Sequence, residues 1–310
     1  MKRALVKTLI TLVLTGAIAS YDFSSTPCTS QDMQQSPINI NYNQTTFSNT
    51  NYFRILSNNF KPITPSNKWT YFPNELAIGV EPTSQIGDFG SMLFVKDWAI
   101  YNFILKKIIF RIGSENSIEN SISNAEMQLV FLQDSNYYSP GKRIFLDANY
   151  LIVSVPFRLN TDPNVKNSRL FEFMNLKAFA SNPTANANIG MARDIKLHQF
   201  IVHQPAFLYE GTLTYPECQK ALWLLMTQFH PISSTDLSLL KNAISANFPL
   251  TDNKPFNTRD LKPLRTDTPI YRNYEDLNAL VMKSNLLNYN NDDYVKNCLM
   301  FLLIVLALLF

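Results

Sequence analysis

Residues 106–121, KKIIFRIGSENSIENS, read as a β-strand followed by a turn. The Ile and Phe residues of the first half are typical of a strand, and the Gly, Ser and Asn residues after Arg111 are typical of a turn. The arrangement is that of a metal-binding strand, yet the stretch contains no His, Cys or Asp. The stretch therefore predicts one strand of a sheet. It leaves open which function a site on this strand could have without metal ligands.

The composition favours a mainly β fold. Of the 310 residues, 46% are hydrophobic, 13% aromatic and 16% charged, which is enough to bury one large core or two modest ones. The 22 Phe and 14 Tyr residues are strand formers, and stretches with helical periodicity are few. We expect a single mainly β domain over residues 20–273, with no linker or repeat inside it.

Strand-like runs recur along this domain and are separated by Asn, Ser, Asp and Pro. They are residues 51–56, 100–110, 126–132, 150–158 and 196–202. The best helix candidate is residues 233–245, where Ser233 or Ser234 caps the start and the Leu and Ile residues face inward. Residues 216–229 have features of both a helix and a strand.

The N-terminus is predicted to be a secretory signal peptide over residues 1–19. Three cations precede the apolar residues 9–14, and Ala17-Ile18-Ala19 fits a small-residue cleavage site. A transmembrane helix is the alternative, but the apolar run is short and is interrupted by Thr and Gly.

The C-terminus is predicted to be a membrane-attachment segment. Residues 298–310, CLMFLLIVLALLF, form an apolar run of 13 residues, which is short for a membrane span. Because the run follows a polar spacer over residues 274–297, it resembles a signal for a glycolipid anchor. A tilted or incomplete membrane helix is the alternative.

The predicted signal peptide also affects the charge and the cysteines. Its loss removes three cations and no acid, so that 27 Lys and Arg become 24, equal to the 24 Asp and Glu. No overall charge then favours nucleic acid. Secretion permits a disulfide between Cys28 and Cys218, the two cysteines outside the tail, and glycosylation of Asn43 in the sequon Asn43-Gln44-Thr45.

Four motifs resemble the α-class carbonic anhydrases in order and spacing. They are QQSPINI (34–40), LYEGTLTYPEC (208–218), PISSTDLSLLKNA (231–243) and NTRDLKPL (257–264). The resemblance implies one domain around a large, mostly antiparallel twisted sheet with a few short peripheral helices. It also implies that Cys28 pairs with Cys218, because secreted members link cysteines at these two positions.

The resemblance places the family's three zinc-binding histidines at positions 109, 111 and 128. Here these positions hold Ile109, Arg111 and Gln128. A catalytic zinc needs three donors with lone pairs, which Ile and a guanidinium lack and Gln supplies poorly. Without the ion, nothing lowers the pKa of a bound water toward 7. We therefore expect no zinc and no CO2 hydration at the family's rate. The same resemblance puts Phe60 at the proton-shuttle histidine.

The surroundings of the site are less altered, according to the resemblance. Glu115 matches the buried acid after the zinc strand, Thr214 the hydroxyl that this acid orients, and Glu126 the carboxylate beside the third ligand. The walls of the substrate pocket are expected at Val130, Val153, Leu213 and Trp223, for which ordinary core packing is the alternative.

Charge adds a hypothesis about the centre of this site. Lys107, Ile109 and Arg111 point the same way, because side chains alternate along a strand. A buried, unpaired Arg111 would cost several kcal/mol, so we expect it to pair with Glu115 or Glu126, replace zinc electrostatically and hold both carboxylates ionised. In the alternative, Lys107 and Arg111 together attract a carboxylate or sulfate.

Three functions follow from these expectations. The first is a catalytically inactive carbonic-anhydrase-related protein at the extracellular face of a membrane, which binds another protein or a sulfated glycan. The second is an enzyme, either a carbonic anhydrase with an atypical zinc ligand set or an esterase. The third is a structural component of a surface coat or organelle lumen.

Overall fold

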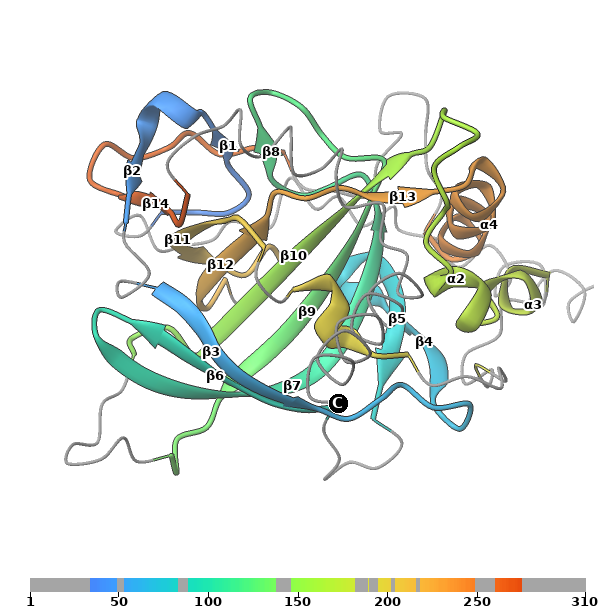
Figure 1. The fold of residues 1–310 in the computed structure, drawn as a ribbon, viewed down its shortest axis with the longest axis horizontal. Coiled ribbons are helices and arrows are strands. Elements are labelled where there is room, and N and C mark those ends of the chain that lie inside the picture. The colour runs from blue at the N-terminus through green and yellow to red at the C-terminus, as the bar shows by residue number, and fades with distance from the viewer. Residues whose placement is uncertain are drawn as a thin grey trace, which may run out of the picture.

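A large twisted sheet forms the body of the protein in the computed structural model (Figure 1). The structure describes residues 34–48, 53–82, 89–137, 146–181, 189, 195–201, 204–215, 218–248 and 260–274. The predicted segments 1–19 and 298–310 lie outside these residues, as does the spacer apart from Tyr274. Among the helices that are described, none has the length and apolar character needed to cross a membrane.

The strands are named in chain order. They are β1 (Asn39–Ile40), β2 (Thr45–Phe47), β3 (Phe53–Phe60), β4 (Lys68–Phe72), β5 (Ala77–Glu81), β6 (Gly90–Lys96), β7 (Ala99–Ile112), β8 (Ser117–Ile118), β9 (Ala125–Gln133), β10 (Tyr150–Leu159), β11 (Ala206–Thr212), β12 (Lys220–Met226), β13 (His230–Ile232) and β14 (Ile270–Arg272). The α-helices are α2 (Leu170–Phe173), α3 (Leu176–Ser181) and α4 (Ser234–Ser245), and the 3-10 helices are Tyr42–Gln44, Pro73–Glu75 and Leu197–Phe200.

The main sheet has 12 strands among the described residues, in the order β2-β14-β11-β12-β10-β9-β7-β5-β4. Strand β6 also pairs with β7, β3 with β6 and β13 with β10. Most pairs are antiparallel, but β12 and β13 run parallel to β10, and β14 runs parallel to β2. The expected mainly β fold around a large, mostly antiparallel twisted sheet is confirmed.

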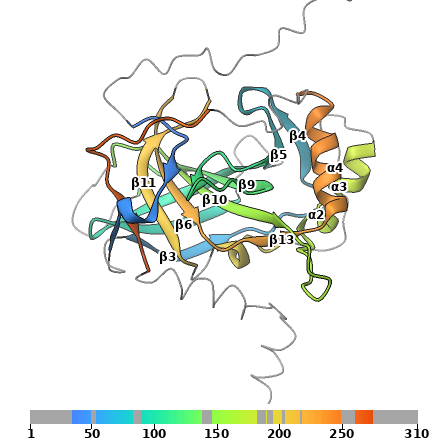
Figure 2. The same cartoon turned by 90° about the horizontal axis from the view of Figure 1, so that it is seen from above.

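The two faces of the sheet carry separate cores. On one face, alternate residues of the central strands, such as Leu129 and Val153, join the main core with residues of α2, α3 and α4. These helices gather beside one end of the sheet (Figures 1 and 2). On the other face, a second core contains Ile109, Val130 and Trp223. Because β7, β9 and β10 are covered on both sides, they can be almost continuously apolar.

Most predicted elements are present. Four of the five predicted strands form β3, β7, β9 and β10, and the ambiguous residues 216–229 contain strand β12. The predicted helix is α4, and Ser233 caps it by accepting a hydrogen bond of 2.9 Å from the Asp236 backbone N–H.

The prediction of a strand over residues 196–202 is wrong. This segment contains the 3-10 helix Leu197–Phe200. The helix buries Leu197 and Phe200, which are three residues apart, against the main core and leaves His198 exposed. A spacing of three suits a 3-10 turn, in which side chains at i and i+3 lie above one another.

Candidate functional site

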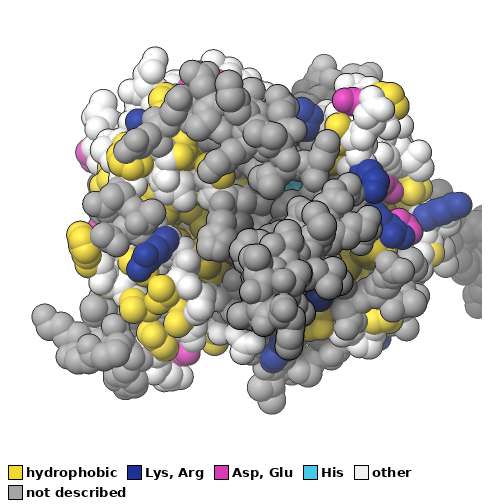
Figure 3. Space-filling view, in the orientation of Figure 1, with side chains coloured by type: hydrophobic (Ala, Val, Ile, Leu, Met, Phe, Trp, Pro, Cys, Tyr) yellow, Lys and Arg dark blue, Asp and Glu magenta, His cyan; other side chains and the backbone are white. Residues whose placement is uncertain are grey.

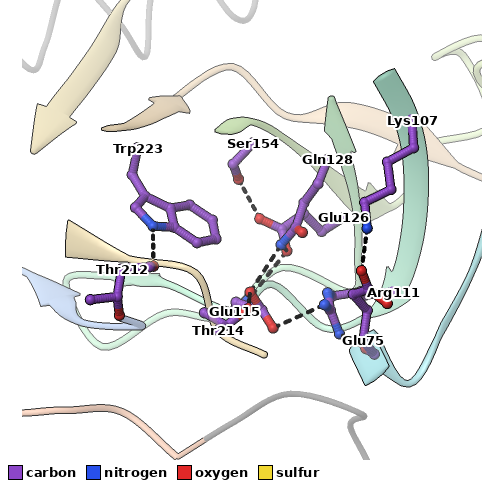
Figure 4. A network of polar contacts seen from close by, with 10 residues as sticks. All are labelled: Glu75, Lys107, Arg111, Glu115, Glu126, Gln128, Ser154, Thr212, Thr214 and Trp223. Atoms are coloured by element: carbon purple, nitrogen blue, oxygen red, sulfur yellow. Dashed lines mark hydrogen bonds and ion pairs between the residues drawn. The ribbon is translucent and has the colours of Figure 1, made fainter. Parts of the chain in front are cut away.

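The pairing of β7 with β9 brings the key positions onto one face of the sheet. Ile109 lies opposite Gln128, and Arg111 lies opposite Glu126. In the next pair of strands, Ser154 of β10 lies opposite Gln128. Because side chains alternate along each strand, all five point to the face that carries the second core. Figure 4 shows the polar members of this group together.

Arg111 is buried and bonded within the protein. Its side chain is 2% exposed, and its Nη2 lies 3.3 Å from Oε1 of Glu115, whose side chain is equally buried. Its Nη1 donates a hydrogen bond to the backbone carbonyl of Glu75. The expected contact with Glu115 is therefore present, and the guanidinium does not turn toward solvent.

Glu115 is bound from three sides. Besides Arg111, the hydroxyl of Thr214 donates a hydrogen bond of 2.6 Å to its Oε2. The side-chain amide of Gln128 donates to the same oxygen over 3.2 Å. The contact with Thr214 is the one that the sequence analysis expected at these two positions.

Gln128 also connects the two buried acids. Its Nε2 lies 2.8 Å from Oε2 of Glu126 in addition to its bond with Glu115 (Figure 4). Glu126 further accepts a bond of 3.1 Å from the Glu115 backbone N–H and a short bond from the Ser154 hydroxyl. An amide with two N–H groups can bridge two carboxylates in this way, whereas a metal-binding group would have to present a lone pair.

Burial raises the pKa of Glu126 from its ordinary 4.5 to about 7. The neighbouring negative charge of Glu115 raises this pKa further, and the bonds from Ser154 and the Glu115 backbone, with the more distant charge of Arg111, lower it only in part. The hypothesis that Arg111 holds both carboxylates ionised is therefore wrong for Glu126. Its raised pKa means that this carboxyl group holds a proton more readily than an ordinary one does.

A third acid, Glu75, completes the cluster and was missed by the sequence analysis. It ends the 3-10 helix Pro73–Glu75, is 5% exposed and forms an ion pair with Nζ of Lys107. The ammonium also lies 5.1 Å from the ring centre of Phe72 and 4.9 Å from that of Tyr215. The sequence around it, FPNEL (72–76), resembles an ordinary surface turn. Glu75 could have been indicated only by the need of Lys107, the second inward-facing cation, for an acidic partner.

The acids of the cluster at least match its two cations in charge. Lys107 and Arg111 carry two positive charges, Glu75 and Glu115 carry two negative ones, and Glu126 is partly neutral. The cluster therefore has no excess positive charge, and the idea that Lys107 and Arg111 attract an external anion loses its electrostatic basis.

Three of the four expected wall residues lie beside the cluster. Val130, Leu213 and Trp223 belong to the second core, and the Trp223 indole donates a hydrogen bond of 2.9 Å to the Thr212 carbonyl. The expectation for Val153 is wrong, because Val153 belongs to the main core on the opposite face.

The error at Val153 is a slip of one residue along a strand. Its neighbour Ile152 pairs with Val130 and with Trp223 in the adjacent strands and joins them in the second core. A shift by one residue moves a side chain to the other face of a sheet. The alternation of Ile152, Ser154 and Pro156 against Val153 and Val155 was the signal that could have shown this.

A comparison with protein families identifies the fold. A family model described as eukaryotic-type carbonic anhydrase matches residues 22–270. The chain belongs to this family. A search among curated proteins finds no match.

Solved structures of carbonic anhydrases share the fold at low sequence identity. The α-carbonic anhydrase of Thermovibrio ammonificans, solved with the inhibitor sulfanilamide, is 18% identical over 77% of this chain and 86% of that chain, with a TM-score of 0.54. A halotolerant carbonic anhydrase of Dunaliella salina is 16% identical over 79% of this chain and 89% of that chain, with a TM-score of 0.56.

Dioscorin has the same fold and was solved in complex with ascorbate. It is 22% identical over 79% of this chain and 87% of that chain, with a TM-score of 0.58. At these identities the likeness shows the fold alone.

The residues at the zinc position of this carbonic anhydrase domain do not fit zinc. Ile109 has no donor atom, the Arg111 guanidinium has only N–H groups, and the Gln128 amide nitrogen is used for the two carboxylates. The part of the chain that is described contains no group of three or more His, Cys, Asp and Glu side chains arranged to hold a metal.

The two histidines among the described residues lie away from this cluster. His198 is exposed on its 3-10 helix, and His230 packs against Phe157 and Phe200 on the side of the main core. His203 lies outside the described residues. Phe60, expected at the proton-shuttle position, packs against Phe131 of the main core, on the other face of the sheet from Arg111. Their ring centres lie 5.9 Å apart, and the ring planes are tilted by 47°.

Two further predicted sites have structural counterparts. Cys218 is disulfide-bonded, and both other cysteines, Cys28 and Cys298, lie outside the described residues. The pairing of Cys218 with Cys28 stays a prediction. Asn43 is exposed within the 3-10 helix Tyr42–Gln44, and its glycosylation stays a prediction.

Proposed function

We propose that this chain is a catalytically inactive member of the carbonic anhydrase family that acts as a binding or scaffold module. The observation that carries the proposal is the place of Arg111. A cation stands at a zinc-ligand position and is paired there with Glu115 in the protein interior. A zinc ion at that place would meet a fixed positive charge, and neither Ile109 nor Arg111 would offer it a lone pair.

The neighbouring contacts support the same proposal. Gln128 donates its amide hydrogens to Glu115 and Glu126, so the third ligand position is also used for internal bonds. Without a metal-bound water of low pKa, this site has no hydroxide nucleophile for CO2. We propose that the cluster is instead a structural plug that ties β7, β9 and the turn at Glu75 together.

We further propose that the protein is secreted and held at the extracellular face of a membrane by its C-terminus. The predicted signal peptide and apolar tail support this location. The disulfide at Cys218 supports it as well, because disulfides persist in oxidising compartments. On the face drawn in Figure 3, the visible Lys and Arg side chains are scattered among polar, hydrophobic and acidic ones. Because the cations visible on this face have acidic and apolar neighbours, we propose a protein partner there rather than a sulfated glycan, which needs a localised basic surface.

Metal analysis together with an activity assay tests the proposal. The protein is produced by secretion from cultured cells, purified in zinc-containing buffer and dialysed, beside an active carbonic anhydrase treated identically. We expect zinc far below one equivalent per chain and CO2 hydration at the rate of the buffer. One tightly held zinc per chain with hydration activity would restore the enzyme as the better assignment.

A further inference from the structure

The hairpin between β6 and β7 has an unusual turn. Lys96 and Ala99 form the last strand pair, so Asp97 and Trp98 are a two-residue loop. Both have left-handed backbone angles, with φ of 51° and 66°. Such turns favour Asn-Gly or Gly-Gly, because a side chain with a Cβ is strained at positive φ. A bulky Trp at the second position is therefore unfavourable for folding.

Burial does not compensate for this strain. The side chain of Trp98 is 74% exposed, whereas the chain's two other tryptophans, Trp69 and Trp223, are at most 1% exposed. An indole that contributes so little to the core has no evident role in folding. Backbone strain that folding does not need is a reason to look for a function, and exposed Trp is the residue type most enriched at the centres of protein interfaces.

A buried lysine holds the turn in place. Lys96 has a side chain only 8% exposed, and its Nζ lies 2.5 Å from Asp97 Oδ2 and 2.9 Å from Glu210 Oε1 of β11. The bond to Glu210 fixes the tip of the hairpin against β11, which is separated from β7 by several strands in the order of the sheet. The hairpin and β11 lie on the same side of the molecule in Figure 1.

Two exposed acids accompany the turn that carries the indole. Asp97 and Glu210 have side chains that are 48% and 62% exposed, and Lys96 offsets only one of their two charges. Among the described residues, Lys96 contacts one oxygen of each carboxylate, Oδ2 of Asp97 and Oε1 of Glu210. The tip thus combines an aromatic face with a net negative charge.

We propose that this tip, formed by Asp97, Trp98 and Glu210, binds an arginine or lysine side chain of a partner protein. A cation over an indole face is attracted by the ring, and adjacent carboxylates add charge-assisted hydrogen bonds. The same acids repel a sulfated glycan. The inference deepens the proposed binding function, because it names the surface and the chemistry of the partner.

Binding of a short peptide tests the proposal on the full chain. The probe is a fluorescein-labelled peptide with three arginines, and its control has citrulline, a neutral isostere, at the same positions. We expect an anisotropy change with the arginine peptide that weakens as salt is raised from about 50 mM to about 300 mM. The citrulline peptide should bind about tenfold more weakly.

Substitutions separate binding from folding. Trp98→Gly relieves the strained turn, so we expect an unchanged or higher melting temperature with about tenfold weaker peptide binding. Asp97→Asn keeps a residue type that tolerates positive φ. A double variant with Asp97→Asn and Glu210→Gln should bind the arginine peptide more weakly than the wild type does. Leu56→Ala removes another exposed apolar side chain, on β3, and should leave binding unchanged.

Several results would overturn this assignment. Equal binding of the arginine and citrulline peptides, or full binding by Trp98→Gly, would exclude cation recognition at the tip. Preferential binding of a neutral oligosaccharide would assign the indole to a glycan, and self-association lost in Trp98→Gly would assign it to a second copy of the chain. None of these results would alter the zinc content or hydration rate, which test the proposed function separately.

Discussion

Nη2 of Arg111 lies 3.3 Å from Oε1 of Glu115, and both side chains are 2% exposed. A buried pair of this kind contributes little net stability, because both charges lose their hydration. Removing one partner has a much larger effect, since the other charge is left buried and uncompensated. The pair therefore keeps this buried cluster stable only as long as both residues are present.

Arg111→Met should strongly destabilise the protein. The substitution keeps an unbranched side chain but leaves Glu115 without its cation, for which we expect a loss of about 3–5 kcal/mol in the free energy of unfolding measured in urea. Arg111→Met combined with Glu115→Gln should recover part of the loss. The control is Arg169→Met, at an exposed surface pair with Glu172, which should leave the urea midpoint nearly unchanged. Equal midpoints for Arg111→Met and the wild type would contradict the structural role of the pair.

Glu126 should make stability fall as the pH rises. Its pKa is raised from 4.5 in the unfolded chain to about 7 by burial and by Glu115, so the folded state binds a proton more tightly than the unfolded state. This stabilisation is complete below pH 4.5 and is lost as the pH rises through about 7. The free energy of unfolding should fall by about 3 kcal/mol in total over this range. Glu126→Gln, whose introduced amide can still reach Ser154, should not show the fall.

Urea unfolding of both proteins between about pH 5 and about pH 8 measures this effect. Burial lowers the pKa of His230 from 6.5 to about 4, so His230 contributes stability that is present above 6.5 and lost as the pH falls through about 4. Its contribution has the opposite sign, but it is present in both proteins and cancels in their difference. A difference that stays constant with pH would show that Glu126 does not titrate in this range.

The α4 helix offers a prediction on the fold itself. The Ser233 hydroxyl accepts a bond from the Asp236 backbone N–H, so Ser233→Ala should cost about 1 kcal/mol of stability. Ser234→Ala changes the exposed first residue of the helix without removing the cap and should have a much smaller effect. Thermal or urea unfolding of the two variants distinguishes these outcomes. A larger loss for Ser234→Ala than for Ser233→Ala would place the cap at Ser234, the alternative that the sequence left open.

The sequence predicted those parts of the fold and site that depend on local patterns. Alternation put Lys107 and Arg111 on one face, and the Ser-Ser-Thr-Asp start of α4 marked its cap. Glu75 could not be found, because its partner Lys107 lies 32 positions away and the turn that delivers it has no distinctive sequence. Val153 was misplaced because every residue of β10 from Leu151 to Phe157 is buried and most are apolar, so that the polar Ser154 is the main mark of the face that Ile152 shares.

Ile109→His, Arg111→His and Gln128→His together should create a zinc site. The register of β7 and β9 places the three positions on one face, and loss of Arg111 leaves Glu115 and Glu126 in need of a positive charge, which zinc would supply. We expect the metal-free triple variant to melt below the wild type, and added zinc to raise its melting temperature and bind at about one equivalent per chain. The matched control is Ile109→His with Gln128→His, which keeps Arg111. Its guanidinium repels the ion, so zinc should have little effect on its melting temperature. If zinc stabilises the double and triple variants equally, Arg111 is not what excludes the metal.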